Sequence, residues 1–411
     1  MKFAFVGPEE IAAARRAIAK RFVDQCLYGR QSVGLPTNTK ACGQLLWRES
    51  RQRGLHGTAA AVRVLAQDSD DESHRVVPQL ISYIENRETI ELTGGNHEAM
   101  SLQLDRDSHN VIKISELLYG LSFVDTHTAP TEALRHTLSR ELEDAKMDDR
   151  GWDFFTDFKN EVQLLPTVHA VRALASYGRR SQKSIQYIAD SLHGRAEGSA
   201  LSSSDISVQV FCLYVLAFAG GEQELLPLGE LKSLFLPLWS RLEGLLYDDF
   251  EQNVEYSRDA EHYYVRVPYQ LYLLPLAAKL APLRAFASFA AQSRLASILT
   301  AVESTDGFLY PHSGRHASSR TNAIAYDSLS VLGEQLARSH SFFFLAYGWD
   351  RARRWLGSNY TLRLGYALAG GMIAYAIRSW WLDPGSRTGS VGANFVASLI
   401  LLLLSLRKRR L

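Results

Sequence analysis

Two arginines occupy the same place in a repeated segment, and they are the residues best suited to bind a charged group. Residues 60–66 read AAVRVLA and residues 169–175 read HAVRALA, so Arg63 and Arg172 share the pattern A-V-R-x-L-A. A guanidinium in apolar surroundings needs a carboxylate or phosphate partner. The pair therefore indicates a site for an anionic group, although acidic residues on a neighbouring segment would satisfy both arginines equally well.

The elements that must position these arginines are helical. Between residues 10 and 340 apolar residues recur at intervals of three and four, without sustained alternation of period two. The spacing of the A-V-R-x-L-A segments suits two helical hairpins of roughly 50 residues each. Short glycine turns, such as Gly151-Trp152 and Gly307-Phe308, precede several expected helices, and the large apolar residue of each turn can fill the gap between hairpins.

This pattern resembles the α/α toroid shared by terpenoid cyclases, protein prenyltransferase β-subunits and lanthionine-synthetase-like proteins. Two segments, 149–152 (DRGW) and 306–308 (DGF), resemble the G-x-W/F turns of those families, and 54–59 (GLHGTA) resembles the H-G-x-A repeat of the lanthionine-synthetase group. The resemblance implies an all-α fold over about residues 12–335, in which the inner of two concentric helical rings lines a central cavity. An open helical solenoid is the structural alternative.

In a toroid, polar residues at the starts of the inner helices would converge near the mouth of the cavity. His56, His169 and Gln209 occupy such positions, and Arg63 and Arg172 lie one or two turns deeper. These five residues are the predicted binding site for a polar or anionic ligand. Serial helix capping and hydrogen-bonded core histidines would explain the same pattern.

One acidic string has the form of a catalytic motif. Residues 68–71 read DSDD, which resembles the D-x-D-D motif of class II terpenoid cyclases, and the resemblance implies that Asp70 is a protonated general acid. The alternative is that these acids cap a helix and favour its dipole.

No cofactor or metal is expected. The pairs Asp148-Asp149 and Asp248-Asp249 lack the third acid of a D-D-x-x-D magnesium motif, and no zinc-binding set of cysteine and histidine is visible. His312 and His316 lie in a segment with Pro311 and Gly314, so ordinary loop contacts are favoured over metal binding. The common nucleotide, hydrolase and zinc-protease motifs are also missing.

The C-terminal region predicts a two-helix transmembrane hairpin. Two uncharged apolar runs, 364–377 and 388–406, approach the length that crosses a bilayer, and the turn 383–387 separates them. Trp380 and Trp381 fit an interfacial position, and the small residues Gly365, Ala369 and Gly371 permit close packing into a homo-oligomer. Two buried helices of an ordinary core are the alternative.

Charge divides the chain in the same place. Residues 351–411 hold ten basic residues and one acidic residue, whereas residues 1–350 hold 35 basic and 43 acidic residues. An acidic body argues against direct nucleic-acid binding, and a basic tail fits an anionic lipid bilayer. The three widely spaced cysteines fit a reducing compartment. Arginines flanking both apolar runs then place the body and both termini in the cytoplasm, at a bacterial inner membrane.

These observations predict three parts: a toroid domain over residues 1–340, an interfacial linker over 341–360 and a transmembrane hairpin over 361–411. The domain order resembles membrane effectors of bacterial anti-phage systems, which implies a sensing or binding body, a possible cytosolic protein trigger and an effector hairpin. The alternatives are a membrane-tethered enzyme that acts on a prenyl or other lipid-like substrate, with Asp70 as its acid, and a membrane-anchored assembly scaffold.

Overall fold

The computed structural model divides the chain into two compact units, Met1–Phe343 and Phe344–Leu411. Within them it describes residues 5–27, 38–40, 55–92, 111–124, 129–154, 156, 161–196, 203–219, 224–242, 253–256, 262–265, 270–304, 307 and 316–357. The unit boundary falls inside the last helix described, near the expected domain boundary at residue 340.

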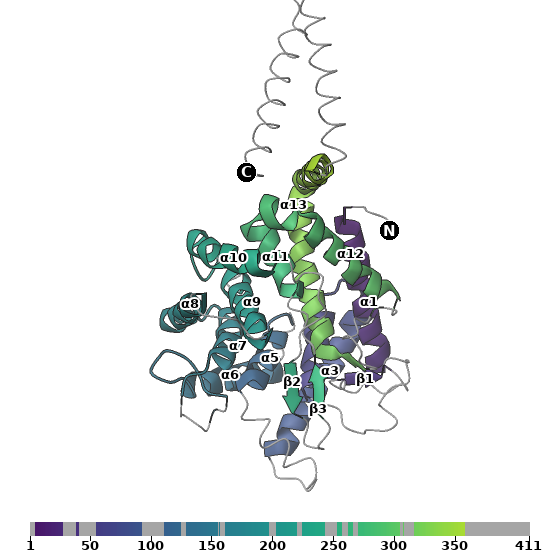
Figure 1. Cartoon of the computed structure of the whole chain (residues 1–411). Coiled ribbons are helices and arrows are strands. Elements are labelled where there is room, and N and C mark those ends of the chain that lie inside the picture. The colour runs from purple at the N-terminus through teal and green to yellow at the C-terminus, as the bar shows by residue number, and fades with distance from the viewer. Residues whose placement is uncertain are drawn as a thin grey trace, which may run out of the picture. The chain divides into compact units, whose positions relative to one another are not determined.

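Helices make up almost all of the described part (Figure 1), which confirms the all-α class. Its twelve α-helices are α1 (Pro8–Leu27), α2 (Leu55–Leu65), α3 (Asp71–Leu92), α5 (Val111–Leu121), α6 (Ala129–Asp144), α7 (Leu164–Ala175), α8 (Gln182–Ala196), α9 (Ser203–Phe218), α10 (Leu228–Leu242), α11 (Gln270–Leu280), α12 (Phe289–Ser304) and α13 (Ser319–Gly357). A short π-helix, η4 (Pro282–Phe286), precedes α12.

Four short strands form two antiparallel pairs that the sequence analysis did not predict. β1 (Asn38–Lys40) pairs with β4 (His316–Ser318), and β2 (Asn253–Tyr256) pairs with β3 (His262–Val265). Strands of three or four residues are too short to show the period-two alternation by which strands are recognised in a sequence.

Alternate helices of unit 1 are neighbours of one another. α2 packs on α5, α5 on α7, α7 on α9 and α9 on α11, while each also packs on the helix that follows it or on η4. α1 contacts α2, α3 and α12, so the first helix lies beside one of the last. Side chains join α1 to α13 as well, because Arg15 donates to the Tyr326 hydroxyl over 3.2 Å.

Burial separates the helices that other elements surround from the helices that lie at the surface. In α9 every residue from Val210 to Ala217 is buried, and α7 is buried on all its faces. α8 buries Ile185, Ile188 and Leu192 but exposes Gln186 and Asp190, as an amphipathic surface helix does. A helix that is buried on every face has neighbours on every side, so α7 and the buried part of α9 lie between other elements.

The turn before α7 shows how one hairpin joins the next. Residues 147–151 form a tight turn in which Asp148 and Asp149 have φ of 48° and 57°, and Gly151 follows without a side chain. Trp152 is fully buried, and its indole Nε1 donates to the Leu142 carbonyl over 2.5 Å. Its backbone N–H donates to Thr167 Oγ1 at the start of α7 over 3.0 Å. The predicted role of this turn, in which the aromatic residue fills the gap, is confirmed.

The prediction of membrane and transmembrane character requires a correction. Among the residues that the structure describes, no helix combines the length and the apolar character needed to cross a bilayer. α13 is long, with 39 residues, but polar and charged side chains interrupt it throughout. The predicted apolar runs lie outside the described residues, and so do Gly365, Ala369, Gly371, Trp380 and Trp381.

Substituting Gly151 with alanine tests whether the turn requires a residue without a side chain. An alanine Cβ would lie 2.4 Å from Thr167 Oγ1 and 2.5 Å from Val162 Cγ1, so the neighbours must move. We expect Gly151→Ala to lower the free energy of unfolding by about 1–3 kcal/mol, as overpacking does, when measured by urea denaturation. Gly229→Ala is the control, because no atom lies within 4 Å of its added Cβ and alanine favours a helix. Equal stability of the two variants would contradict the assigned role of the turn.

Candidate functional site

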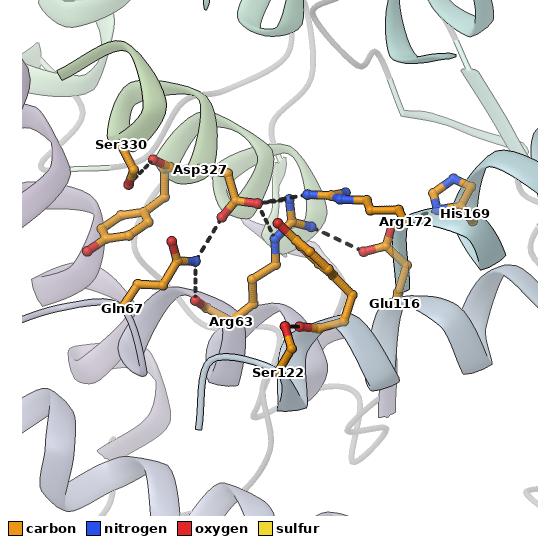
Figure 2. A network of polar contacts seen from close by, with 10 residues as sticks. Arg63, Gln67, Glu116, Ser122, His169, Arg172, Asp327 and Ser330 are labelled. Carbon is orange, nitrogen blue, oxygen red and sulfur yellow. Dashed lines mark hydrogen bonds and ion pairs between the residues drawn. The ribbon is translucent and has the colours of Figure 1, made fainter. Parts of the chain in front are cut away.

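Seven polar or aromatic side chains form one interacting group, which we call the Asp327 cluster. They come from α2, the turn that follows it, α5, α7 and α13. Figure 2 shows the charged core of this group, with Asp327 projecting from α13 toward the two arginines. The members are Arg63, Gln67, Glu116, Tyr119, His169, Arg172 and Asp327.

The carboxylate of Asp327 is the acceptor on which the cluster converges. Its Oδ2 accepts from Arg63 Nε over 2.6 Å, from Arg63 Nη2 and from Arg172 Nη2 over 2.9 Å. Its Oδ1 accepts from the Gln67 amide over 3.0 Å. One buried carboxylate therefore joins residues that are 264 and 155 positions away in the chain.

A second carboxylate links the arginines to the histidine. Glu116 Oε2 lies 3.2 Å from Arg63 Nη1, and Glu116 Oε1 lies 2.9 Å from His169 Nδ1. A neutral His169 that donates from Nδ1 would leave Nε2 as an acceptor. Two guanidiniums and two carboxylates then balance, and protonation of His169 would add one positive charge.

Aromatic rings surround the charged groups. The guanidinium carbon of Arg172 lies 3.7 Å from the ring centre of Tyr119, and that of Arg63 lies 4.9 Å from it. Phe211 of α9 contacts His169, with ring centres 4.7 Å apart, and Tyr272 of α11 contacts Phe211. Cations over aromatic faces are stabilised by the ring quadrupole, most strongly where water is excluded.

Burial and charge shift the pKa values of these groups. Burial and the nearby Arg172 lower the pKa of Arg63, but the carboxylates of Asp327 and Glu116 outweigh both and the net shift is upward. For Arg172 burial also lowers the pKa, whereas Tyr119, Asp327 and Glu116 raise it to a net increase. Burial raises the pKa of Tyr119 and, more strongly, of Tyr214, and the charge of Asp327 adds to both increases. The arginines stay charged and the phenols neutral at physiological pH.

One donor atom of the cluster has no hydrogen-bond partner among the residues that the structure describes. It is Nη1 of Arg172, a residue that is 3% exposed and whose guanidinium stacks on the Tyr119 ring. A buried donor without a partner carries the full cost of desolvation, about 1–3 kcal/mol and more for a charged group.

Three of the five predicted ligand-binding residues meet in the cluster, namely Arg63, His169 and Arg172. His56 is the second residue of α2, but its side chain is outside the part of the chain that the structure describes. Gln209 is buried in α9, yet it lies about 200° around the helix axis from Phe211, the residue that contacts His169. Its side chain therefore points away from the helix face that meets the cluster.

Asp70, the predicted general acid, has the geometry of a helix cap. It is exposed at the start of α3, where its Oδ1 accepts from the backbone N–H of Glu72 over 3.0 Å. Asp68 is the buried acid of the string, and it accepts from Ser73 Oγ over 2.7 Å. An exposed carboxylate that accepts a backbone N–H at a helix start is a helix cap.

Asp327, Glu116 and Tyr119 belong to the site but were not predicted from the sequence. The sequence does contain a signal for Tyr119 and Asp327. A four-residue pattern recurs along the chain, with a variable residue first, any residue second, leucine third and a small residue fourth. The variable position holds Arg63, Tyr119, Arg172, Tyr214, Leu274 and Asp327. Asp327 thus occupies the same repeat position as both arginines, and an acid there is the complement that they require.

In the described residues no group of three or more histidines, cysteines or acids is arranged to hold a metal ion. Comparison with known protein families and with curated proteins finds no match to this chain. The site is therefore interpreted from its own geometry.

Removing one arginine of the cluster tests how strongly the network stabilises the fold. Arg63→Met leaves the buried carboxylates of Asp327 and Glu116 without their shared partner, so we expect a loss of about 3–5 kcal/mol in the free energy of unfolding. The control is Arg179→Met, whose exposed ion pair with Glu143 should contribute about 0–1 kcal/mol. Urea denaturation followed by circular dichroism measures both. A loss at Arg63 no larger than that at Arg179 would contradict a stabilising role.

The raised tyrosine pKa values predict a loss of stability at alkaline pH. Because the folded-state pKa of Tyr214 lies well above its ordinary value of 10.0, the unfolded chain ionises first as the pH rises. Stability is fully present below pH 10 and falls above it, by about 1.4 kcal/mol per pH unit for each such tyrosine. In urea titrations between pH 9 and 11, Tyr214→Phe should lose less stability as the pH rises. The difference in slope should approach about 1.4 kcal/mol per pH unit at the upper end of this range. An unchanged slope would refute the assignment to Tyr214.

Proposed function

We propose that the helices of unit 1 close into an α/α toroid, with α2, α5, α7, α9, α11 and α13 as the inner ring. The neighbour contacts from α2 to α11 support this arrangement, as does the contact of α13 with both α2 and α7 through Asp327. The outer ring would consist of α1, α3, α6, α8, α10 and α12. The contacts of α1 with both α3 and α12 support closure of that ring.

We infer that this module is a binding protein that recognises a small polar or anionic ligand at the Asp327 cluster. The observation that carries the proposal is the Nη1 atom of Arg172, a buried charged donor that has no hydrogen-bond partner among the described residues. Proteins rarely leave such a group unsatisfied unless it has a function or a ligand. The surrounding arginine, histidine and tyrosine side chains would supply further polar contacts, and their mutual ion pairs hold them in place before the ligand arrives.

Recognition accounts for the cluster better than catalysis does. Both oxygens of Asp327 already accept hydrogen bonds from side chains of the cluster, and both oxygens of Glu116 are engaged by Arg63 and His169. Carboxylates that are occupied in this way are poorly placed to take a proton from a substrate. The proposal concerns unit 1 only and does not depend on the residues beyond it.

A second candidate is an enzyme that acts on a prenyl or other lipid-like substrate. One observation favours it: Phe211, Tyr214 and Tyr272 pack together on α9 and α11, with ring centres 4.9–5.1 Å apart for the contacts with Tyr272. Aromatic faces of this kind stabilise carbocations. The exposed position of Asp70 leaves such an enzyme without the acid that the D-x-D-D resemblance implies.

The binding proposal is tested by replacing Arg172 with lysine in the full chain. Lysine keeps a positive charge for Asp327 but lacks the second amino group, so we expect at least a tenfold loss of ligand affinity while the fold is retained. Native mass spectrometry of the purified protein detects a small molecule that remains bound. A thermal-stability screen against phosphate, carboxylate and sugar compounds then identifies its class.

Arg179→Lys is the matched control, since Arg179 lies at the surface and its guanidinium pairs with the exposed Glu143. Circular dichroism establishes that both variants fold. The same bound molecule or the same stabilising compound in wild type and Arg172→Lys, at the same concentration, would refute the binding site.

A further inference from the structure

We propose that Arg63 and Arg172 form a phosphate-binding subsite whose resident occupant is the carboxylate of Asp327. In this proposal the phosphate group of a ligand replaces that carboxylate, so that ligand binding and the docking of Asp327 exclude one another. The proposal rests on the function inferred above, and it adds the chemical class of the ligand and the means by which binding is regulated.

The two guanidiniums share one oxygen of Asp327. Arg63 Nε, Arg63 Nη2 and Arg172 Nη2 all donate to Oδ2 of Asp327, while Oδ1 faces the Gln67 amide. A guanidinium and a carboxylate fit best when two parallel hydrogen bonds reach two oxygens. Neither arginine has that arrangement with Asp327, so the carboxylate is an incomplete match to the site that holds it.

The second argument is the count of acceptor oxygens. Three donor atoms of the two arginines converge on one oxygen, and a fourth, Arg172 Nη1, reaches none. A tetrahedral phosphate offers more oxygens than a carboxylate, and it can accept from both arginines and from Gln67 at once. It also carries about −1.5 to −2 charges at neutral pH, compared with −1 for Asp327. The geometry therefore favours phosphate over a second carboxylate.

The third argument is the origin of Asp327 on a different helix from either arginine. Arg63 belongs to α2 and Arg172 to α7, and Asp327 ties both of them to α13. Displacing its carboxylate removes that tie, while Arg15 and Tyr326 still join α13 to α1. Asp327 thus acts as an internal competitor, which lowers the affinity for phosphate and couples binding to the release of one contact of α13.

The test removes the competitor and supplies the anion from solution. In full-length Asp327→Ala the two arginines lose their shared carboxylate, so the variant should be less stable than wild type. Inorganic phosphate should then restore part of the lost melting temperature. We expect its apparent dissociation constant to be at least tenfold lower for Asp327→Ala than for wild type, at constant ionic strength adjusted with sodium chloride. Acetate should give a weaker effect at equal concentration.

Two further variants keep the test decisive. Asp327→Asn retains the side-chain volume and removes the charge, so it replaces Asp327→Ala if the alanine variant does not fold. Combining Asp327→Asn with Arg172→Met should abolish the tighter phosphate binding, which separates a site from general stabilisation by phosphate. Equal phosphate binding by wild type and both Asp327 variants, or equal effects of acetate and phosphate, would overturn the proposal.

The outcome also distinguishes this proposal from the function on which it rests. If Arg172→Lys loses a bound ligand but the Asp327 variants gain no phosphate binding, the binding function stands and the exchange with Asp327 is wrong. If the Asp327 variants bind phosphate tightly but Arg172→Lys retains the natural ligand, a phosphate subsite exists and the binding function was assigned to the wrong place.

Discussion

The sharing of one carboxylate by two buried guanidiniums is the interaction on which the architecture of unit 1 depends. Arg63 and Arg172 are 1% and 3% exposed, and a charged group at such a depth is tolerated only with a partner of opposite charge. Asp327 is that partner for both, and it comes from a third helix. The need to neutralise the arginines therefore specifies which helices must meet, in addition to the apolar contacts that hold each hairpin together.

The same interaction would set the proposed binding function against stability. A network that satisfied every donor would be rigid and closed to other molecules, whereas this one balances its charges and still leaves Nη1 of Arg172 without an acceptor. The aromatic rings of Tyr119 and Phe211 exclude water from the arginines and strengthen every electrostatic contact nearby. Because water is excluded, a donor without an acceptor costs more free energy, and a hydrogen bond that pairs it stabilises the structure more.

Much of this arrangement could be predicted from the sequence, and the failures have physical causes. Periodicity and repeat spacing predict the helical class, and the A-V-R-x-L-A segments predict that Arg63 and Arg172 act together. Their partner could not be chosen from composition, because Asp327 lies hundreds of residues from Arg63 and its segment resembles the repeat only weakly. Gln209 was assigned to the site from its place near a helix start, but the helix face that it occupies depends on packing against α8 and α10. The letters around Asp70 match the D-x-D-D motif, but the residue lies exposed at the start of α3, where it caps the helix.

The great separation between Asp327 and its partners has a consequence for how the protein is made. Contacts between distant parts of a chain require closure of long loops, so they form late and slow the folding of domains that depend on them. During synthesis from the N-terminus, at about 5–20 residues per second, the two arginines leave the ribosome long before Asp327 exists. Until α13 emerges, Arg63 can pair with Glu116 but Arg172 must stay hydrated, so the early helices can remain only loosely assembled. Folding of the domain can therefore be completed only after this one carboxylate, near the end of unit 1, has been synthesised.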